Sequence, residues 1–272
     1  MPSTRSIPFL ARALLLATAL AGAGMAASAS TVASVQLTNV QVQVIDLTPD
    51  DGNWPWLYVV NSVDWAPTAS SATAQVDTTS GPSERDGWLG TVLSAAQSGV
   101  HASASATTGS GDFSSGGASS AGVSAQASWN GSAWSVAQLF GGEFFAGAGT
   151  EVVVTADVQS IVADGGNDGG SAMALASLGI SNADGSAFDS SQAWIFDSPS
   201  FVDASTPTTL TVRWYNYSSD SATGQLWVEA SAQAISSVPE PASAAMIGVA
   251  ALLGVARLRG VAKSATGPRR RA

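Results

Sequence analysis

The sequence predicts an all-β fold, an antiparallel, jelly-roll-like β-sandwich, with a signal peptide before it and a transmembrane helix after it. Three observations support this prediction. Short segments of alternating apolar and polar residues recur through residues 30–236, and turns rich in Gly, Asp, Asn and Ser separate them at the spacing typical of sandwiches. Long uncharged apolar runs flank this region near both ends of the chain. We therefore predict a signal peptide at 1–29, one acidic domain at 30–236 and a C-terminal membrane segment at 237–272.

The N-terminal segment has the pattern of a cleavable export signal. Arg5 and Arg12 precede the apolar residues 13–23, and the small residues Ala27 and Ala29 suit signal peptidase. We expect the mature chain to begin at Ser30 and to lie outside the cytoplasm.

Residues 35–62 are predicted to form a β-hairpin. Val40, Val42 and Val44 alternate with glutamines, which gives a strand one buried and one solvated face. The residues 49–53 have turn composition, and the β-formers of 56–62 follow.

The next segments are rich in serine and alanine. Residues 100–107 and 121–129 are predicted as two strands around a flexible loop, and as peripheral, because small side chains bury little area. The segment 134–140 is expected to pack more deeply. For 83–97 the pattern leaves a short helix and a strand both open.

The second half contains the clearest strand patterns. Residues 150–162 give the strongest one, and 171–180, 193–196, 210–217 and 225–235 follow. Two of these strands carry side chains predicted to face the core, namely Leu210, Val212, Trp214, Leu226, Val228 and Ala230. The alternate side chains Thr211, Arg213 and Tyr215 are expected to face water.

Charge and cysteine content exclude several functions. Residues 30–238 hold 19 acidic and 2 basic side chains and no lysine, a net charge of −17. Binding to nucleic acid is not expected, since phosphate contacts need a basic face. Without cysteine, the chain has no disulfide and no thiolate ligand or nucleophile.

Catalytic residues are not assigned, and an enzyme is not predicted. His101 is the single histidine, so a Ser-His-Asp triad would depend on it, and it lies in a Ser/Ala tract without an evident partner. A pair of carboxylates remains as an alternative, because a glycoside hydrolase needs only two.

Two glycine-rich turns contain clustered oxygen ligands. Asp164, Asn167 and Asp168 lie in one of them, and residues 50–53 form a similar turn. Calcium prefers such oxygen sites, but Asp, Asn and Gly are also the usual residues of plain turns. Calcium is the one cofactor that the sequence suggests.

Nine tryptophans suggest a carbohydrate-binding module as a further alternative, because exposed indole rings stack on sugars. The tryptophans nearest to predicted loops are Trp54, Trp56, Trp65 and Trp88. Burial in predicted strands accounts for Trp134, Trp214 and Trp227.

The C-terminal segment combines three features in a fixed order. Val238, Pro239, Glu240 and Pro241 form an extended segment, because the residue before a proline avoids helix. The uncharged residues 242–256 follow, and as a helix they would span only ~22 Å of a ~30 Å hydrocarbon core. Basic residues that can snorkel or stay cytoplasmic complete the tail: Arg257, Arg259, Lys263, Arg269, Arg270 and Arg271.

This order resembles the PEP-CTERM sorting signal of exported bacterial proteins, and residues 45–52 resemble openings common among their exported domains. The resemblance implies processing by exosortase, with the membrane and signal peptidase as earlier partners. It also implies a precursor anchored in the inner membrane and a product at the cell surface or in the extracellular matrix. We expect a structural or adhesive role there, with exopolysaccharide as a partner. A plain C-terminal anchor with a proline-rich stalk is the alternative.

Overall fold

The computed structural model describes residues 30–59, 70–77, 79–86, 92–109, 118–166 and 169–237. These residues form 14 β-strands and contain no helix, and all strand pairs among them are antiparallel. The prediction of an all-β, antiparallel protein is confirmed. Within this part of the chain, no helix is long and apolar enough to cross a membrane. The predicted signal peptide and the residues of the sorting signal from 238 onward lie outside the described residues.

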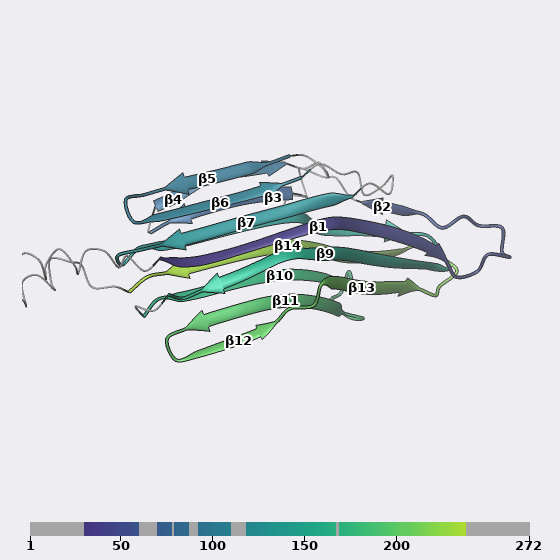
Figure 1. Ribbon diagram of the computed structural model, residues 1–272. Helices are drawn as coiled ribbons and strands as arrows, with labels where there is room; N and C mark the ends of the chain where they lie inside the picture. The colour runs from purple at the N-terminus through teal and green to yellow at the C-terminus, as the bar shows by residue number, and fades with distance from the viewer. Residues whose placement is uncertain are drawn as a thin grey trace, which may run out of the picture. The chain divides into compact units, whose positions relative to one another are not determined.

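The strands form two sheets (Figure 1). The smaller sheet has six strands, in the order β13 (Thr209–Asn216), β9 (Thr150–Asp164), β1 (Thr31–Asp46), β7 (Ser119–Ala127), β6 (Ala102–Thr108) and β5 (Ser94–Ser98). The larger sheet has eight, in the order β12 (Phe201–Ser205), β11 (Asp189–Ser198), β10 (Ser171–Asn182), β14 (Ala222–Ile235), β8 (Ser132–Ala146), β3 (Ser70–Val76) and β4 (Thr79–Asp86), with β2 (Leu57–Val59) also paired to β8.

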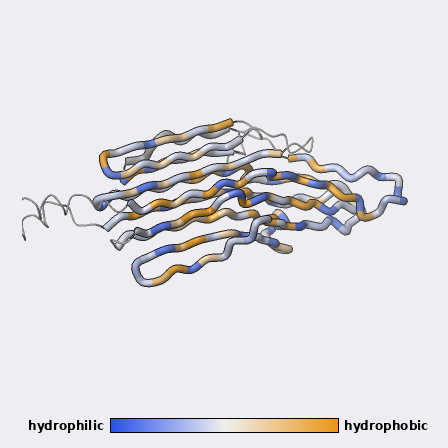
Figure 2. Tube along the Cα trace, in the orientation of Figure 1, coloured by the Kyte–Doolittle hydropathy of each residue, from blue (hydrophilic) through white to orange (hydrophobic). Residues whose placement is uncertain are grey.

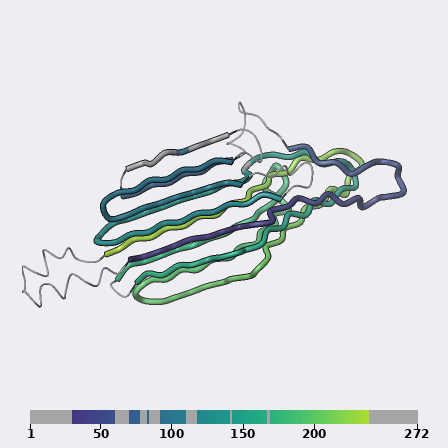
Figure 3. The backbone as a smooth tube through the Cα atoms, turned by 45° about the horizontal axis from the view of Figure 1, so that its top comes forward, coloured from purple at the N-terminus to yellow at the C-terminus, as the bar shows by residue number. Residues whose placement is uncertain are grey.

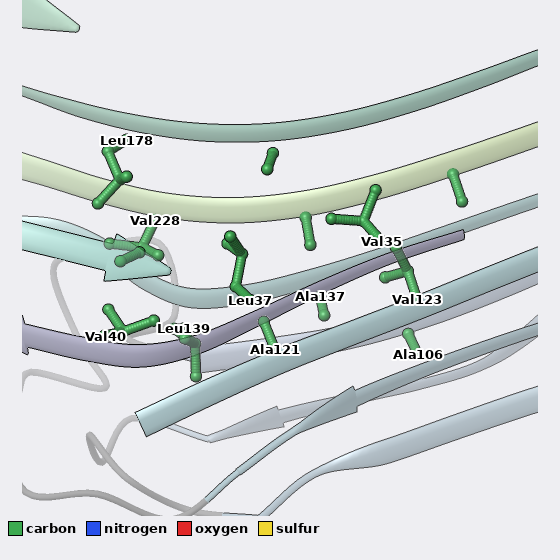
Figure 4. Packing of buried hydrophobic residues seen from close by; sticks show 14 of the residues in the cluster. Val35, Leu37, Val40, Ala106, Ala121, Val123, Ala137, Leu139, Leu178 and Val228 are labelled. Carbon is green, nitrogen blue, oxygen red and sulfur yellow. The ribbon is translucent and has the colours of Figure 1, made fainter. Parts of the chain in front are cut away.

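The core lies between the sheets, where β1 packs against β14 and β7 against β8. Apolar and polar residues alternate along the strands (Figure 2), as a buried inner face and a solvated outer face require. The serine- and alanine-rich strands were wrongly predicted as peripheral, because Ala106, Ala121 and Ala125 on β6 and β7 are at most 1% exposed. Figure 4 shows small side chains such as Ala106, Ala121 and Ala137 beside Val35 and Leu139. Many small side chains fill this part of the core in place of a few large ones.

The predicted inner faces of β13 and β14 are confirmed. Leu210 and Val212 are fully buried and Trp214 is 2% exposed, and on β14 the inward residues Leu226, Val228 and Ala230 are also buried. Thr211, Arg213 and Tyr215 lie on the exposed side of β13.

The hairpin predicted for residues 35–62 is wrong. The β1 strand belongs to the smaller sheet, whereas β2 pairs with β8 in the larger one. The connection at 47–56 carries the chain from one sheet to the other, which alternation within each strand cannot reveal. The segment 83–97 contains the end of β4 and all but the last residue of β5, and its residues 87–91 are not described.

The first strand, β1, begins and the last strand, β14, ends at the same end of the domain. We call it the proximal end. Thr31 Oγ1 donates a hydrogen bond to the carbonyl of Gly165 (3.2 Å), and the amide of Ser236 donates to the carbonyl of Gly131 (3.0 Å). Ile235 pairs with Ser132, the first residue of β8, whereas β2 pairs with the last residues of β8. At ~3.3 Å per residue, β8 separates the proximal end from β2 by roughly 45 Å. The end that contains β2 is the distal end (Figures 1 and 3).

Candidate functional site

Four exposed aromatic side chains lie together at the distal end, and we call them the distal aromatic strip. Trp54, Trp56 and Tyr58 alternate along the chain and are 88%, 46% and 61% exposed. Phe145 on β8 is 38% exposed and lies directly opposite Tyr58 in the β2–β8 pairing. Directly opposed residues of an antiparallel pair hold their side chains on the same face. Tyr58 and Phe145 therefore share the outer face of the larger sheet, and Trp54 and Trp56 lie in the segment that leads into β2.

Gly147 fixes the position of Trp56. A Cβ atom at Gly147 would lie only 2.7 Å from Nε1 of Trp56, so the indole occupies space that any other residue would fill. The amide of Gly147 donates to the carbonyl of Trp56 (3.0 Å), and Nδ2 of Asn216 donates to the carbonyl of Gly147 (2.7 Å). The turn after β8 and the end of β13 thus hold the backbone beneath the strip.

The loop before the strip is held by its own hydrogen bonds. A carboxylate oxygen of Asp51 accepts from the amide of Asn53 (2.7 Å) and the other accepts from Oγ1 of Thr48 (2.8 Å). These bonds lower the pKa of Asp51, with the backbone bond from Asn53 as the largest cause. The amide of Leu47 donates to the carbonyl of Gly149 (2.7 Å), which ties the loop to the turn after β8. Residues 50–53 form the predicted turn, and Asp51 is ionised in it.

The charges around the strip are negative. Asp50 and Asp51 are exposed in the loop, and Glu143 is exposed two residues before Phe145 on the same side of β8. Among the described residues of the distal end, Arg213 is the one basic side chain. Its Nη1 donates to Oε1 of Glu151 in an ion pair. Glu151 and its hydrogen bond are the main causes that raise the pKa of Arg213.

The sequence located the strip only in part. Trp54 and Trp56 are exposed as predicted, whereas Trp65 and Trp88 lie outside the described residues. Tyr58 and Phe145 were missed, because only the pairing of β2 with β8 brings them together.

Two tryptophans that were predicted to be buried lie on the outer face of the larger sheet. Trp134 is 37% exposed and Trp227 is partly exposed, so this prediction is wrong for both, whereas it is confirmed for Trp214. Trp227 stacks on Phe188, with ring centroids 5.4 Å apart, and a Cβ atom at Gly179 would overlap its indole. Alternation within a strand shows which residues share a face, but here both faces carry apolar residues.

Glu229 is a half-buried carboxyl group that sequence analysis did not single out. It lies on the outer face of β14 between Gln138 of β8 and Ser177 of β10. Burial raises its pKa. A glycosidase acid needs a raised pKa, but the residues directly paired with Glu229 carry no second carboxylate.

The predicted calcium turn is described only in part. Oδ1 of Asp164 accepts from the amide of Gly166 (2.8 Å), as in an ordinary Asx turn, and Asn167 and Asp168 lie outside the described residues. Among the residues that the structure covers, no three His, Asp or Glu side chains are grouped to hold a metal ion. Calcium at this turn stays a prediction. His101 is exposed in the turn between β5 and β6, where its carbonyl accepts from the amide of Ser128 (2.8 Å).

The chain was compared with protein-family models, with curated proteins and with solved structures. No family model matches it, and no curated protein or solved structure matches it significantly.

Proposed function

We propose that this chain is an exported, exosortase-sorted surface protein with an adhesive role, and that its domain binds matrix polysaccharide through the distal aromatic strip. The sorting part of the proposal rests on the Pro-Glu-Pro segment, the apolar run and the arginine-rich tail. We also propose a jelly-roll-like arrangement for the domain, and the repeated passage of the chain between two antiparallel sheets supports it.

The exposure of the strip is the observation that carries the binding proposal. Burial of large aromatic side chains lowers the free energy, so a group of exposed ones marks an interaction surface. Trp54 is 88% exposed, and it directly follows Asn53, whose amide donates to the Asp51 carboxylate. The flat apolar faces of sugar rings fit such side chains, and exposed carboxylates beside them can accept hydrogen bonds from hydroxyl groups.

The position of the strip also supports an adhesive role. Ser237, the last described residue, lies at the proximal end, where its Oγ donates to the carbonyl of Gly169. The strip lies at the other end of β8. A tail that follows Ser237 therefore starts far from the strip along β8.

Glycan-array binding of the purified full chain tests this function, followed by affinity measurements on the polysaccharides that bind. The Trp54→Ala, Trp56→Ala variant should lose at least about tenfold in affinity, since truncating an aromatic residue that anchors a ligand typically costs more than ~1 kcal/mol. Trp134→Ala is the matched control, because this tryptophan is partly exposed on the same sheet near the proximal end. Equal binding by the parent and the double variant would contradict the proposal.

A further inference from the structure

The strip combines aromatic rings with neighbouring carboxyl groups. Glu143 and Phe145 lie two residues apart on one side of β8, so their Cα atoms are ~7 Å apart, and Tyr58 lies directly opposite Phe145. Asp51 lies in the loop that leads into Trp54. The hydrogen bonds that its carboxylate accepts from Thr48 and Asn53 favour the charged form of Asp51. A short oligosaccharide on the rings would therefore also meet negative charge.

This combination suits an ammonium group. A cation is attracted to the face of an aromatic ring, most strongly to tryptophan, and a neighbouring carboxylate adds a charge-assisted hydrogen bond. Neutral sugars gain the stacking contact and hydrogen bonds from their hydroxyl groups to the carboxylates, but no cation–π attraction and no ion pair. The carboxylates of the strip repel uronic acids, which are also anions. Arg213, the one cation among the described residues of this end, is already paired with Glu151 and does not offset this repulsion.

We infer that the distal aromatic strip selects polysaccharides whose sugar units carry free amino groups over neutral polysaccharides and over polymers of uronic acids. This inference rests on the proposed function and narrows it to one substrate class. The rings supply the binding surface, and Glu143 and Asp51 supply the selectivity.

A matched series of oligosaccharides provides the test. β-1,4-Linked hexamers of glucosamine, N-acetylglucosamine and glucose share one backbone and differ at the 2-position, and a galacturonic acid hexamer supplies the anion. Calorimetry with the full chain, at mildly acidic pH and physiological salt, should show about tenfold tighter binding of the glucosamine hexamer than of the two neutral hexamers. The galacturonic acid hexamer should bind more weakly than all three.

Variants separate the carboxylates from the rings. Glu143→Gln, alone or with Asp51→Asn, should weaken binding of the glucosamine hexamer more than binding of the neutral hexamers, because only the ammonium groups lose an ion pair. Glu229→Gln is the matched control. Glu229 lies on the same face of the sheet, but it is distant from the strip, because it pairs with Gln138, which lies well before Phe145 along β8. Trp54→Ala with Trp56→Ala should weaken binding of all hexamers at least about tenfold.

Nonspecific attraction to a chain of net charge −10 must be distinguished from selection by the strip. A preference for the amine that survives Trp54→Ala with Trp56→Ala, or an equal affinity for oligolysine, would overturn the inference. So would equal binding of the three hexamers, although strip-dependent binding of the neutral ones would leave the proposed function intact. If no hexamer and no array glycan binds through the strip, both proposals fail.

Discussion

The indole nitrogen of Trp214 donates a hydrogen bond to Oδ1 of Asn182 across 2.7 Å, which links β13 of the smaller sheet to the end of β10 in the larger sheet. The same indole meets Phe144 edge to face, with ring centroids 5.0 Å apart. Trp214 therefore joins the two layers by both a polar and an apolar contact.

Trp214→Ala should lower the free energy of unfolding by roughly 3–5 kcal/mol, because it leaves a large cavity beside Phe144 and removes the donor to Asn182. Urea unfolding followed by circular dichroism measures the loss. Trp214→Phe should lose less, since it retains most of the apolar volume. Tyr215→Ala is the neighbouring control, because this side chain is 40% exposed. A loss below ~1 kcal/mol for Trp214→Ala would contradict its assigned burial.

Gly179 should not tolerate alanine. The new Cβ atom would lie 1.9 Å from Cζ2 of Trp227, so the indole must move and its stacking on Phe188 must change. We expect a loss of about 1–3 kcal/mol in unfolding free energy, as for overpacked sites, together with an altered tryptophan emission spectrum.

Gly142→Ala is the matched control for Gly179→Ala. It lies on β8 of the same sheet, and a Cβ atom there meets nothing within 4 Å. Alanine at this position should change stability by at most about 1 kcal/mol. Equal effects of the two substitutions would contradict contact with Trp227 as the cause of the cost at Gly179.

The sequence predicted the inner face of β13 correctly, because Leu210, Val212 and Trp214 alternate with polar residues. It failed for β6 and β7, where alanine alternates with serine. Side-chain volume suggested little burial there, yet Ala104 and Ala125 are nearly inaccessible. Burial at these positions is set by the opposite sheet, which a local pattern does not contain.

The candidate site was predictable to the same limited degree. Placement in a loop was sufficient to expose Trp54 and Trp56. Tyr58 and Phe145 become neighbours only because β2 leaves β1 and pairs with β8. The half-burial of Glu229 likewise depends on side chains from β8 and β10, so its outward position in the strand pattern gave no sign of a raised pKa.

Glu229→Gln should make the protein more stable at neutral pH relative to its parent. Burial raises the pKa of Glu229 above its ordinary value of 4.5, so the folded state favours the protonated form. This contribution is fully present below pH 4.5 and is lost as pH rises through the folded pKa. The residues paired with it, Gln138 and Ser177, and the adjacent Trp227 and Ser231 carry no charge that reverses this sign.

The measurement is the difference in melting temperature between Glu229→Gln and the parent at several pH values. The difference should increase as pH rises from 4.5 towards neutrality. Hydrogen bonds lower the pKa of Asp51 and of Asp184, and this effect is common to both proteins and cancels. Glu143→Gln is the control, because Glu143 is exposed on the same face. A difference that stays constant with pH would contradict the assigned burial of Glu229.

The sorting proposal predicts that processing depends on the Pro-Glu-Pro residues and not on the apolar run alone. Replacing Pro239, Glu240 and Pro241 by alanine leaves residues 242–256 and the basic tail unchanged, so membrane insertion should persist while maturation fails. Immunoblots of the membrane, cell-surface and medium fractions should show a precursor that accumulates in the membrane. Pro207→Ala, in the exposed connection between β12 and β13, is the control for loss of a proline and should mature like the parent. If the triple variant also matures like the parent, the tail is a plain anchor and the exosortase proposal is wrong.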